Sequence, residues 1–104
     1  MNKTFSWLVV GLGVQRRILN YTNQIMMVEV KFEKGAKGDP HSHPHTQATY
    51  VLSGEFSFTI GDKVVVIKKG ETCTMEPEVI HSCICLKEGV LLDVFTPFRE
   101  DFLL

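Results

Sequence analysis

The stretch His41-Ser42-His43-Pro44-His45-Thr46-Gln47 contains three of the four histidines in this chain. Side chains two positions apart in an extended strand point to the same side, so His41 and His43 can bind one ion together. The fourth histidine, His81, follows a distant loop that contains Pro77 and would complete the site from a neighbouring strand. An isolated histidine would be interpreted as a loop residue or a hydrogen-bonding residue. A His-x-His pair with a separate third histidine instead predicts a metal site.

Gln47 is the fourth predicted metal ligand, and its position requires the chain to bend. Six extended residues would carry it about 20 Å from His41, whereas zinc ligands lie about 2.0–2.2 Å from the ion. Pro44 is the expected place of the bend. His45 is expected to line the site or to support a ligand. Imidazole and amide ligands suit zinc, nickel, manganese or iron, so we expect one divalent ion whose identity the sequence does not select.

Short apolar and β-branched runs separated by turns fill the rest of the chain, and no long stretch has a helical period. This pattern is typical of an all-β sandwich or closed barrel. The tail from Arg99 onward is expected to make a short helical turn or to pack across the barrel. We expect strands at 14–19, 25–32, 48–52, 56–60, 63–68, 72–75, 81–86 and 90–96, a loop at 33–40 and a turn at 53–55.

The composition excludes several classes of partner. The 104 residues are 44% hydrophobic and 22% charged, which fits one soluble domain over residues 1–104. A net charge of −1 provides no basic face for a nucleic acid. The apolar run 7–14 is shorter than the roughly 20 residues that cross a membrane, and it has no signal-peptide pattern. We therefore expect a cytoplasmic protein with neither a nucleic acid nor a membrane partner.

The cysteines are Cys73, Cys83 and Cys85, and this odd number argues against a disulfide framework. We interpret them as small apolar core residues. A thiolate near the metal is the alternative for Cys83 or Cys85, because both share the strand parity of His81.

Residues 35–85 resemble the two motifs of the cupin superfamily. Gly38-Asp39-Pro40-His41-Ser42-His43, followed by Gln47 and Gly54, is similar to the first motif, and the stretch from Gly70 to His81 is similar to the second. The resemblance implies a single-domain all-β cupin fold, that is, a double-stranded β-helix or jelly-roll barrel. Most cupins carry Glu where this chain has Gln47. A neutral amide ligand leaves the ion a stronger Lewis acid toward a bound anion.

A longer resemblance points to the pectin-degradation cupins of the KdgF type, which have Gln at that metal position. It is carried by residues 13–19, 26–28, 34–36, 43–47, 50–54 and, most specifically, 89–103. The resemblance implies a non-redox, metal-dependent enzyme that acts on 4,5-unsaturated monouronates from pectin or alginate breakdown. It would convert them to the linear 5-keto-4-deoxyuronate by ring opening and ketonisation. Galacturonate-derived and mannuronate-derived substrates are both open.

Strand parity and the tail of that family together suggest three catalytic residues. Asp93 and Phe95 share one face of a strand, and Arg99 follows closely enough to cover the same cavity mouth. Asp93 lies in an otherwise apolar run, where a carboxylate is costly unless it is paired or faces a polar cavity. We expect Asp93 to be the general acid/base, Arg99 the carboxylate clamp and Phe95 an apolar wall. Core packing for Phe95 and a surface ion pair of Arg99 with Glu100 or Asp101 are the alternatives.

Arg17, Tyr50 and His45 are the predicted substrate-binding residues. Arg16 and Arg17 point to opposite faces of one strand, and we expect Arg17 to reach the pocket. Tyr50 would line the pocket or pack against its neighbours. The apolar residues near the start of the chain suggest a homodimer that pairs through edge strands, as small cupins commonly do.

Two other functions stay open at the level of the sequence. The first is another small-molecule cupin enzyme, either a dioxygenase, which would consume oxygen with iron or copper, or a sugar-acid isomerase. The second is a non-catalytic cupin that binds a small ligand without turnover.

Overall fold

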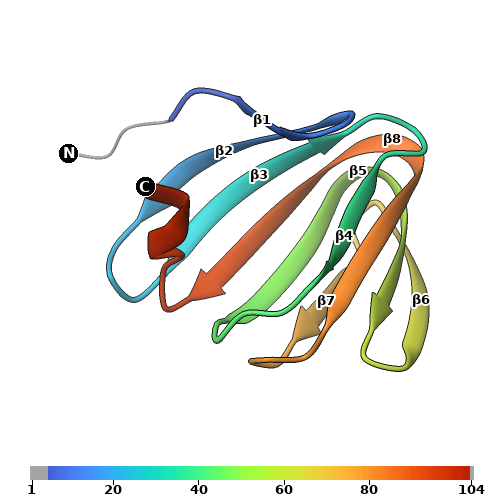
Figure 1. Ribbon diagram of the computed structural model, residues 1–104. Helices are drawn as coiled ribbons and strands as arrows, with labels where there is room; N and C mark the ends of the chain where they lie inside the picture. Colours follow the sequence, from blue (N-terminus) through green and yellow to red (C-terminus); the bar gives the residue numbers. More distant parts are fainter. Residues whose placement is uncertain (1–4, 104) are drawn as a thin grey trace.

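Two long strands, β5 (Thr46–Ile60) and β8 (His81–Thr96), run antiparallel along their full length and form the centre of the fold (Figure 1). The computed structural model describes residues 5–103. The remaining elements are β1 (Leu8–Gly11), β2 (Val14–Tyr21), β3 (Met26–Phe32), β4 (Lys37–His41), β6 (Lys63–Lys68), β7 (Thr72–Met75) and the short 3-10 helix η1 (Glu100–Leu103). No described helix has the length and apolarity that crossing a bilayer requires.

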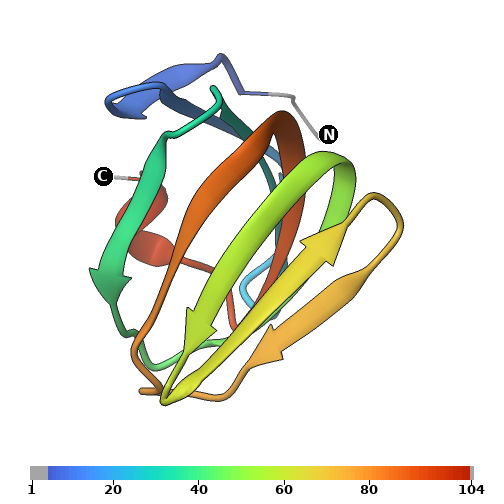
Figure 2. The ribbon, with the colours of Figure 1, turned by 90° about the vertical axis from the view of Figure 1, so that its right-hand side faces the viewer.

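Each long strand belongs to both halves of the fold. The second part of β8 pairs with β3 and with the first part of β5, and the sheet continues through β2 to β1 and, on the other side, to β7. The first part of β8 pairs with β4 and with the second part of β5, which pairs with β6 (Figure 2). The two halves face each other, so this is the all-β cupin fold that the sequence predicts.

The fold bends where β5 and β8 pass closest to each other. The pairing register shifts between Val51 and Phe56. Gly54 has a φ of 82°, and a Cβ placed there would lie 2.5 Å from the carbonyl oxygen of Lys87. A Cβ on Gly89 would lie 2.0 Å from the carbonyl oxygen of Ser53. Only glycine allows the two backbones to come this close. The bend allows β5 and β8 each to pair within both halves of the fold.

The structure corrects six predicted elements: one turn, four strands and one loop. The predicted turn at 53–55 is part of a strand, so the predicted strands 48–52 and 56–60 are joined in the single bent strand β5. In the same way, the predicted strands 81–86 and 90–96 are joined in β8. The predicted loop 33–40 contains most of β4, because Lys37 and Gly38 pair with Ile84 and Cys83 of β8. Pro40 fits there because β4 is an edge strand, which does not need every N–H. β1 was not predicted, since its four residues are exposed and show no alternation.

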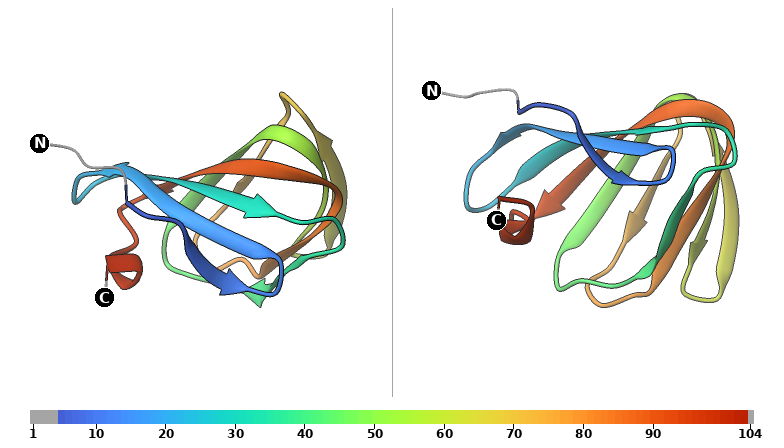
Figure 3. Two further views of the ribbon diagram at one scale, coloured as in Figure 1. Left: turned by 90° about the horizontal axis from the view of Figure 1, so that it is seen from above. Right: turned by 45° about the horizontal axis from the view of Figure 1, so that its top comes forward.

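The core alternates along the two central strands. Val51, Phe56 and Phe58 of β5 are buried between the halves with Cys85 and Leu91 of β8. A second cluster contains Ile18, Met26, Val28 and Phe95, and the tail residues Phe98, Phe102 and Leu103 pack against it. The tail therefore forms a helical turn and covers one end of the sheet, beside β2 and β3 (Figures 1 and 3).

Candidate active site and metal centre

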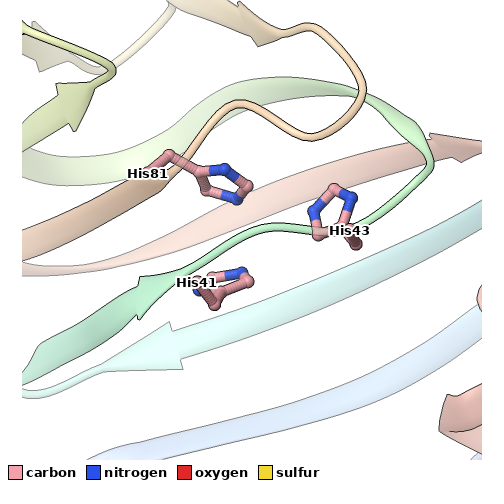
Figure 4. A group of neighbouring side chains, drawn as sticks. All are labelled: His41, His43 and His81. Atoms are coloured by element: carbon pink, nitrogen blue, oxygen red, sulfur yellow. The ribbon is translucent and has the colours of Figure 1, made fainter.

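Three histidines from two separate parts of the chain converge at one end of the fold. One ring nitrogen from each of His41, His43 and His81 lies within 4.8 Å of the other two (Figure 4). His41 ends β4 and is the register partner of His81, which begins β8, while His43 follows in the loop. Zinc–nitrogen bonds of about 2.0–2.1 Å keep any two ligand nitrogens within roughly 4 Å of each other. The three rings are therefore close to ligating distance.

Backbone carbonyls orient two of these rings. His41 Nδ1 lies 2.7 Å from the carbonyl oxygen of Asp39, and His81 Nδ1 lies 3.0 Å from that of Val79. In each case the histidine Nδ1–H donates to the carbonyl oxygen of the residue two positions earlier, which leaves Nε2 with a free lone pair. This arrangement is the usual support of a metal-binding histidine.

Buried nitrogens without partners indicate that the histidines fit an ion. His81 Nε2 and His43 Nδ1 are buried and have no hydrogen-bond partner among the described residues. A buried polar atom left unpaired costs about 1–3 kcal/mol, and a cation bound by the cluster would remove that cost for His81 Nε2. Burial lowers the pKa of His43 to about 4, with help from the positive charge of Arg99, and burial also lowers the pKa of His81. Both rings are thus neutral at pH 7, as metal ligands must be.

Gln47 extends the histidine cluster toward a carboxylate. Its Oε1 lies 3.0 Å from His43 Nε2, so the chain does bend between these residues, as predicted. Its Nε2 donates to Thr49 Oγ1 at 3.0 Å, and Thr49 Oγ1 donates to Asp93 Oδ1 at 2.7 Å. Gln47, Thr49 and Asp93 are all buried, and they link the histidine cluster to an ionisable group.

Asp93 is poised to exchange protons near neutral pH. Burial raises the pKa of Asp93 to about 6, although the hydrogen bonds from Thr49 and Gln47 and the charge of Arg99 partly oppose the shift. A carboxyl group of that pKa is present in both protonation states at neutral pH, as a general acid/base requires.

A cavity of about 400 Å³ brings these groups together. Its lining includes most of the predicted site residues, namely His41, Gln47, His81, Asp93, Phe95 and Arg99, together with Arg16, Cys83 and Phe102. This volume is in the range of roughly 300–1,000 Å³ that small-molecule sites occupy. Phe95 lines the cavity and also belongs to a core cluster, so it is both an apolar wall of the site and a packed core residue.

Arg99 both lines the cavity and forms the ion pair with Asp101 that the sequence left as its alternative role. Its guanidinium lies 5.1 Å from the centre of the Phe95 ring and 4.2 Å from that of Phe102. It also donates from Nε and Nη2 to the two carboxylate oxygens of Asp101, at 3.0 and 2.8 Å. The pairing with Arg99 lowers the pKa of Asp101.

Two predicted pocket residues lie elsewhere. Arg17 is on the outer face of β2. There its Nε donates to Glu29 Oε1 at 2.7 Å, and its guanidinium lies over the Trp7 ring. The arginine that lines the cavity is Arg16, which shares the parity of the buried residues Val14 and Ile18. Tyr50 is 43% exposed because it alternates with Gln47 and Thr49 along β5 and faces outward.

His45 and the cysteines stand outside the histidine cluster. The His45 ring is partly buried, 5.3 Å from the His43 ring and 6.4 Å from the Phe95 ring. Cys83 lines the cavity, but no cysteine joins the cluster within the part of the chain that is described. Burial raises the pKa of Cys83 to about 12, so it stays a thiol, and Cys85 is a core residue.

Two contributors were not identified from the sequence, and a third, Arg16, was weighed against Arg17 but not preferred. Thr49 has the inward parity of Gln47, a signal that would have found it. Arg16 shares the parity of Val14 and Ile18 in the same way. The second unidentified contributor is the loop before β8, in which the Glu78 N–H donates to the His43 carbonyl at 2.8 Å while Val79 orients His81. No local pattern predicts that link, because it joins two segments that are distant in sequence.

Comparison with known proteins agrees with this fold. The cupin domain profile matches residues 28–95. The chain is 39% identical to the pectin degradation protein KdgF of Dickeya dadantii, over 93% of this chain and 90% of that protein. The structure of KdgF from a Halomonas species superposes with a TM-score of 0.90 and 32% identity, over 93% of this chain and 90% of the other. An RmlC-like cupin from Shewanella frigidimarina superposes with a TM-score of 0.90 and 36% identity, over 94% and 88%. This chain therefore belongs to the cupin family and, among cupins, to the KdgF proteins.

Proposed function

We propose that this protein converts 4,5-unsaturated monouronates to the linear 5-keto-4-deoxyuronate without a redox change. The observation that carries the proposal is Asp93, a buried carboxyl group with a pKa of about 6, in the same cavity as His41 and His81. Proton transfer on a small anionic sugar needs three things: a proton-exchanging carboxyl group such as Asp93, a metal site that polarises the sugar oxygens, and an arginine that binds the sugar carboxylate. Membership of the KdgF proteins supports the assignment.

The reaction is an isomerisation, so protons only move within the substrate and the site. Ring opening breaks the bond between C1 and the ring oxygen, as the anomeric hydroxyl loses its proton and the ring oxygen gains one. The product is an aldehyde at C1 and an enol at C5. Ketonisation then delivers a proton to C4 while the C5 hydroxyl loses its own. No oxidant or reductant is consumed.

Different residues of the cavity would transfer the proton, bind the substrate and hold the metal ion. Asp93 would accept and return the moving proton, and Thr49 and Gln47 hold its carboxylate in place through their hydrogen bonds. Arginine at the cavity mouth would bind the substrate carboxylate, and Phe95 would provide an apolar wall. A divalent ion held by His41, His43, Gln47 and His81 would polarise oxygens of the sugar acid.

The direct test is to mix the purified protein with unsaturated galacturonate generated by a lyase and to follow the ultraviolet absorbance of its double bond. A mannuronate-derived sample run in parallel identifies the preferred substrate. We expect the absorbance to fall faster than in the protein-free control, and we expect a chelator to remove the effect. An oxygen electrode in the same cuvette should record no uptake, because uptake would indicate a dioxygenase.

Asp93→Asn is the variant that tests the assigned role. Losing a general acid/base lowers kcat by about 10²–10⁴-fold. Asp62→Asn, at an exposed turn between β5 and β6, is the matched control and should retain the activity of the unmodified chain. An Asp93→Asn protein with undiminished activity would remove Asp93 from the mechanism.

A further inference from the structure

Arg16 lies inside the active-site cavity with its charge unpaired. It lines the cavity from β2, and its guanidinium carbon is 3.6 Å from the centre of the Phe102 ring. Within residues 5–103 its side chain makes neither a hydrogen bond nor an ion pair. A guanidinium in a protein stays charged and carries five donors, so all five are available to a ligand.

The other two arginines near this end of the fold already have carboxylate partners. Arg17 is paired with Glu29 on the outer face, and Arg99 presents Nε and Nη2 to Asp101. Arg16 differs from both of them because its guanidinium N–H groups have no carboxylate partner among the described residues. Burial and the nearby charge of Arg99 lower its pKa, and the carboxylate of Asp101, which is already paired with Arg99, opposes this shift only in part.

Two guanidiniums share one aromatic ring in this cavity. Arg16 lies 3.6 Å and Arg99 lies 4.2 Å from the centre of the Phe102 ring. The ring stabilises each cation, but their mutual repulsion remains. Asp101 already pairs with Arg99, so one ligand carboxylate bound beside them would compensate the remaining positive charge, that of Arg16. The free N–H groups of the planar Arg16 guanidinium match the two oxygens of such a carboxylate.

We propose that Arg16 is the primary carboxylate-binding residue of the active site, with Arg99 held by Asp101 as a second positive charge beside it. This makes Arg16 the residue that selects acidic over neutral sugars. The inference rests on the proposed function only for the kind of sugar involved. It changes the expected role of Arg99, whose two best-placed donors are already in use.

A binding experiment tests the proposal without turnover. Zinc-loaded protein is titrated with galacturonate and, separately, with galactose, and the dissociation constant is measured by NMR chemical shifts or calorimetry. Arg16→Gln should weaken galacturonate binding by about tenfold or more, the effect of one charge-assisted bidentate contact. The same variant should leave the affinity for galactose unchanged. Arg16→Lys, which keeps the charge without the fork, should give an intermediate loss.

Arg17→Gln is the matched control, because the adjacent arginine faces outward and is outside the cavity lining. It should bind galacturonate within about twofold of the unmodified chain, since a surface ion pair contributes little. Thermal unfolding and zinc content of each variant verify that the fold and the metal centre are intact.

Three results would overturn the proposal: equal galacturonate affinity in Arg16→Gln, an equal loss in Arg17→Gln, or no preference of the unmodified chain for galacturonate over galactose. Failure of the proposed reaction is distinguishable from these. If unsaturated uronates are not converted but galacturonate binding still depends on Arg16, the reaction is wrong and the carboxylate site stands. If they are converted and Arg16→Gln binds normally, the reaction stands and the site is wrong.

Discussion

Thr49 and Asp93 are direct register partners on β5 and β8, and the Thr49 hydroxyl donates to the Asp93 carboxylate at 2.7 Å. This contact joins the strand that carries Gln47 to the strand that carries the proposed acid/base. It also opposes the effect of burial on the pKa of Asp93.

Thr49→Val should move the pH dependence of activity. Valine has nearly the same shape but no hydroxyl, so the pKa of Asp93 should rise further above about 6. The acidic limb of kcat/KM should then shift upward by roughly one pH unit, as expected for a lost hydrogen bond to a charged group. Thr49→Ser keeps the hydroxyl and should leave the limb in place. An unshifted limb in Thr49→Val would show that this limb does not report on Asp93.

Asp93→Asn should stabilise the metal-free protein at neutral pH. The folded state holds the Asp93 proton until about pH 6, whereas the unfolded chain loses it near pH 4. Ionised Asp93 therefore destabilises the fold, and this cost develops as the pH rises from about 4 to about 6. Urea denaturation should show Asp93→Asn more stable by about 1–3 kcal/mol at pH 7 and equal at pH 4. A variant less stable at pH 7 would indicate that the carboxylate is a net stabilising group.

His81→Ala should remove the metal site. His81 Nε2 is buried without a hydrogen-bond partner among the described residues, and its ring is already oriented by Val79. We expect metal affinity to fall by more than the roughly 10–100-fold that follows loss of an outer partner. Metal content after dialysis against zinc or nickel, measured by elemental analysis, checks this. His45→Ala is the control and should retain the metal, since His45 is outside the cluster; equal metal loss in both variants would contradict the assigned ligands.

Gly54→Ala should destabilise the fold far more than Gly35→Ala. Both glycines have a positive φ, 82° and 84°, so both substitutions incur the backbone cost of about 1–3 kcal/mol. Only at Gly54 does the new Cβ also meet backbone, 2.5 Å from the Lys87 oxygen, while nothing lies within 4 Å of it at Gly35. Thermal and urea unfolding of the two variants separate these effects. Equal destabilisation would mean that β5 and β8 do not meet as closely as described.

The homodimer expected from the sequence remains a prediction, and β1 is the strand that we expect to form it. β1 is at one end of the sheet order and is an outer strand in both views of Figure 3. Val9 of β1 is 72% exposed, and Leu12, which follows this strand, is 97% exposed. Light scattering after size-exclusion chromatography should give twice the mass of the chain, and Val9→Lys should shift it toward the monomer. Val64→Lys, on β6 at the opposite end, is the control. A monomer at all concentrations, or dissociation by Val64→Lys alone, would contradict an interface at β1.

Much of the site follows from short-range pattern. Residues two apart on a strand share a face, so the parity of β8 places Asp93 and Phe95 together, and they line one cavity. The spacing of His41, His43 and Gln47 requires a bend, and His43 and Gln47 are indeed in contact. These features follow from local backbone geometry, because successive side chains of any strand point to opposite faces and the length of an extended segment limits which residues can meet.

The sequence by itself determined the all-β class, the cluster of histidines with Gln47, and the pairing of faces within each strand. Only the tertiary structure decided which face is inside: Arg16 and Arg17 are opposite in any strand, but packing against β3 and the C-terminal turn turns Arg16 toward the cavity. It also decided that β5 and β8 continue through Gly54 and Gly89, because that bend depends on backbone atoms of the partner strand. Local sequence sets the alternation of side chains, whereas burial depends on contacts between residues that are far apart along the chain.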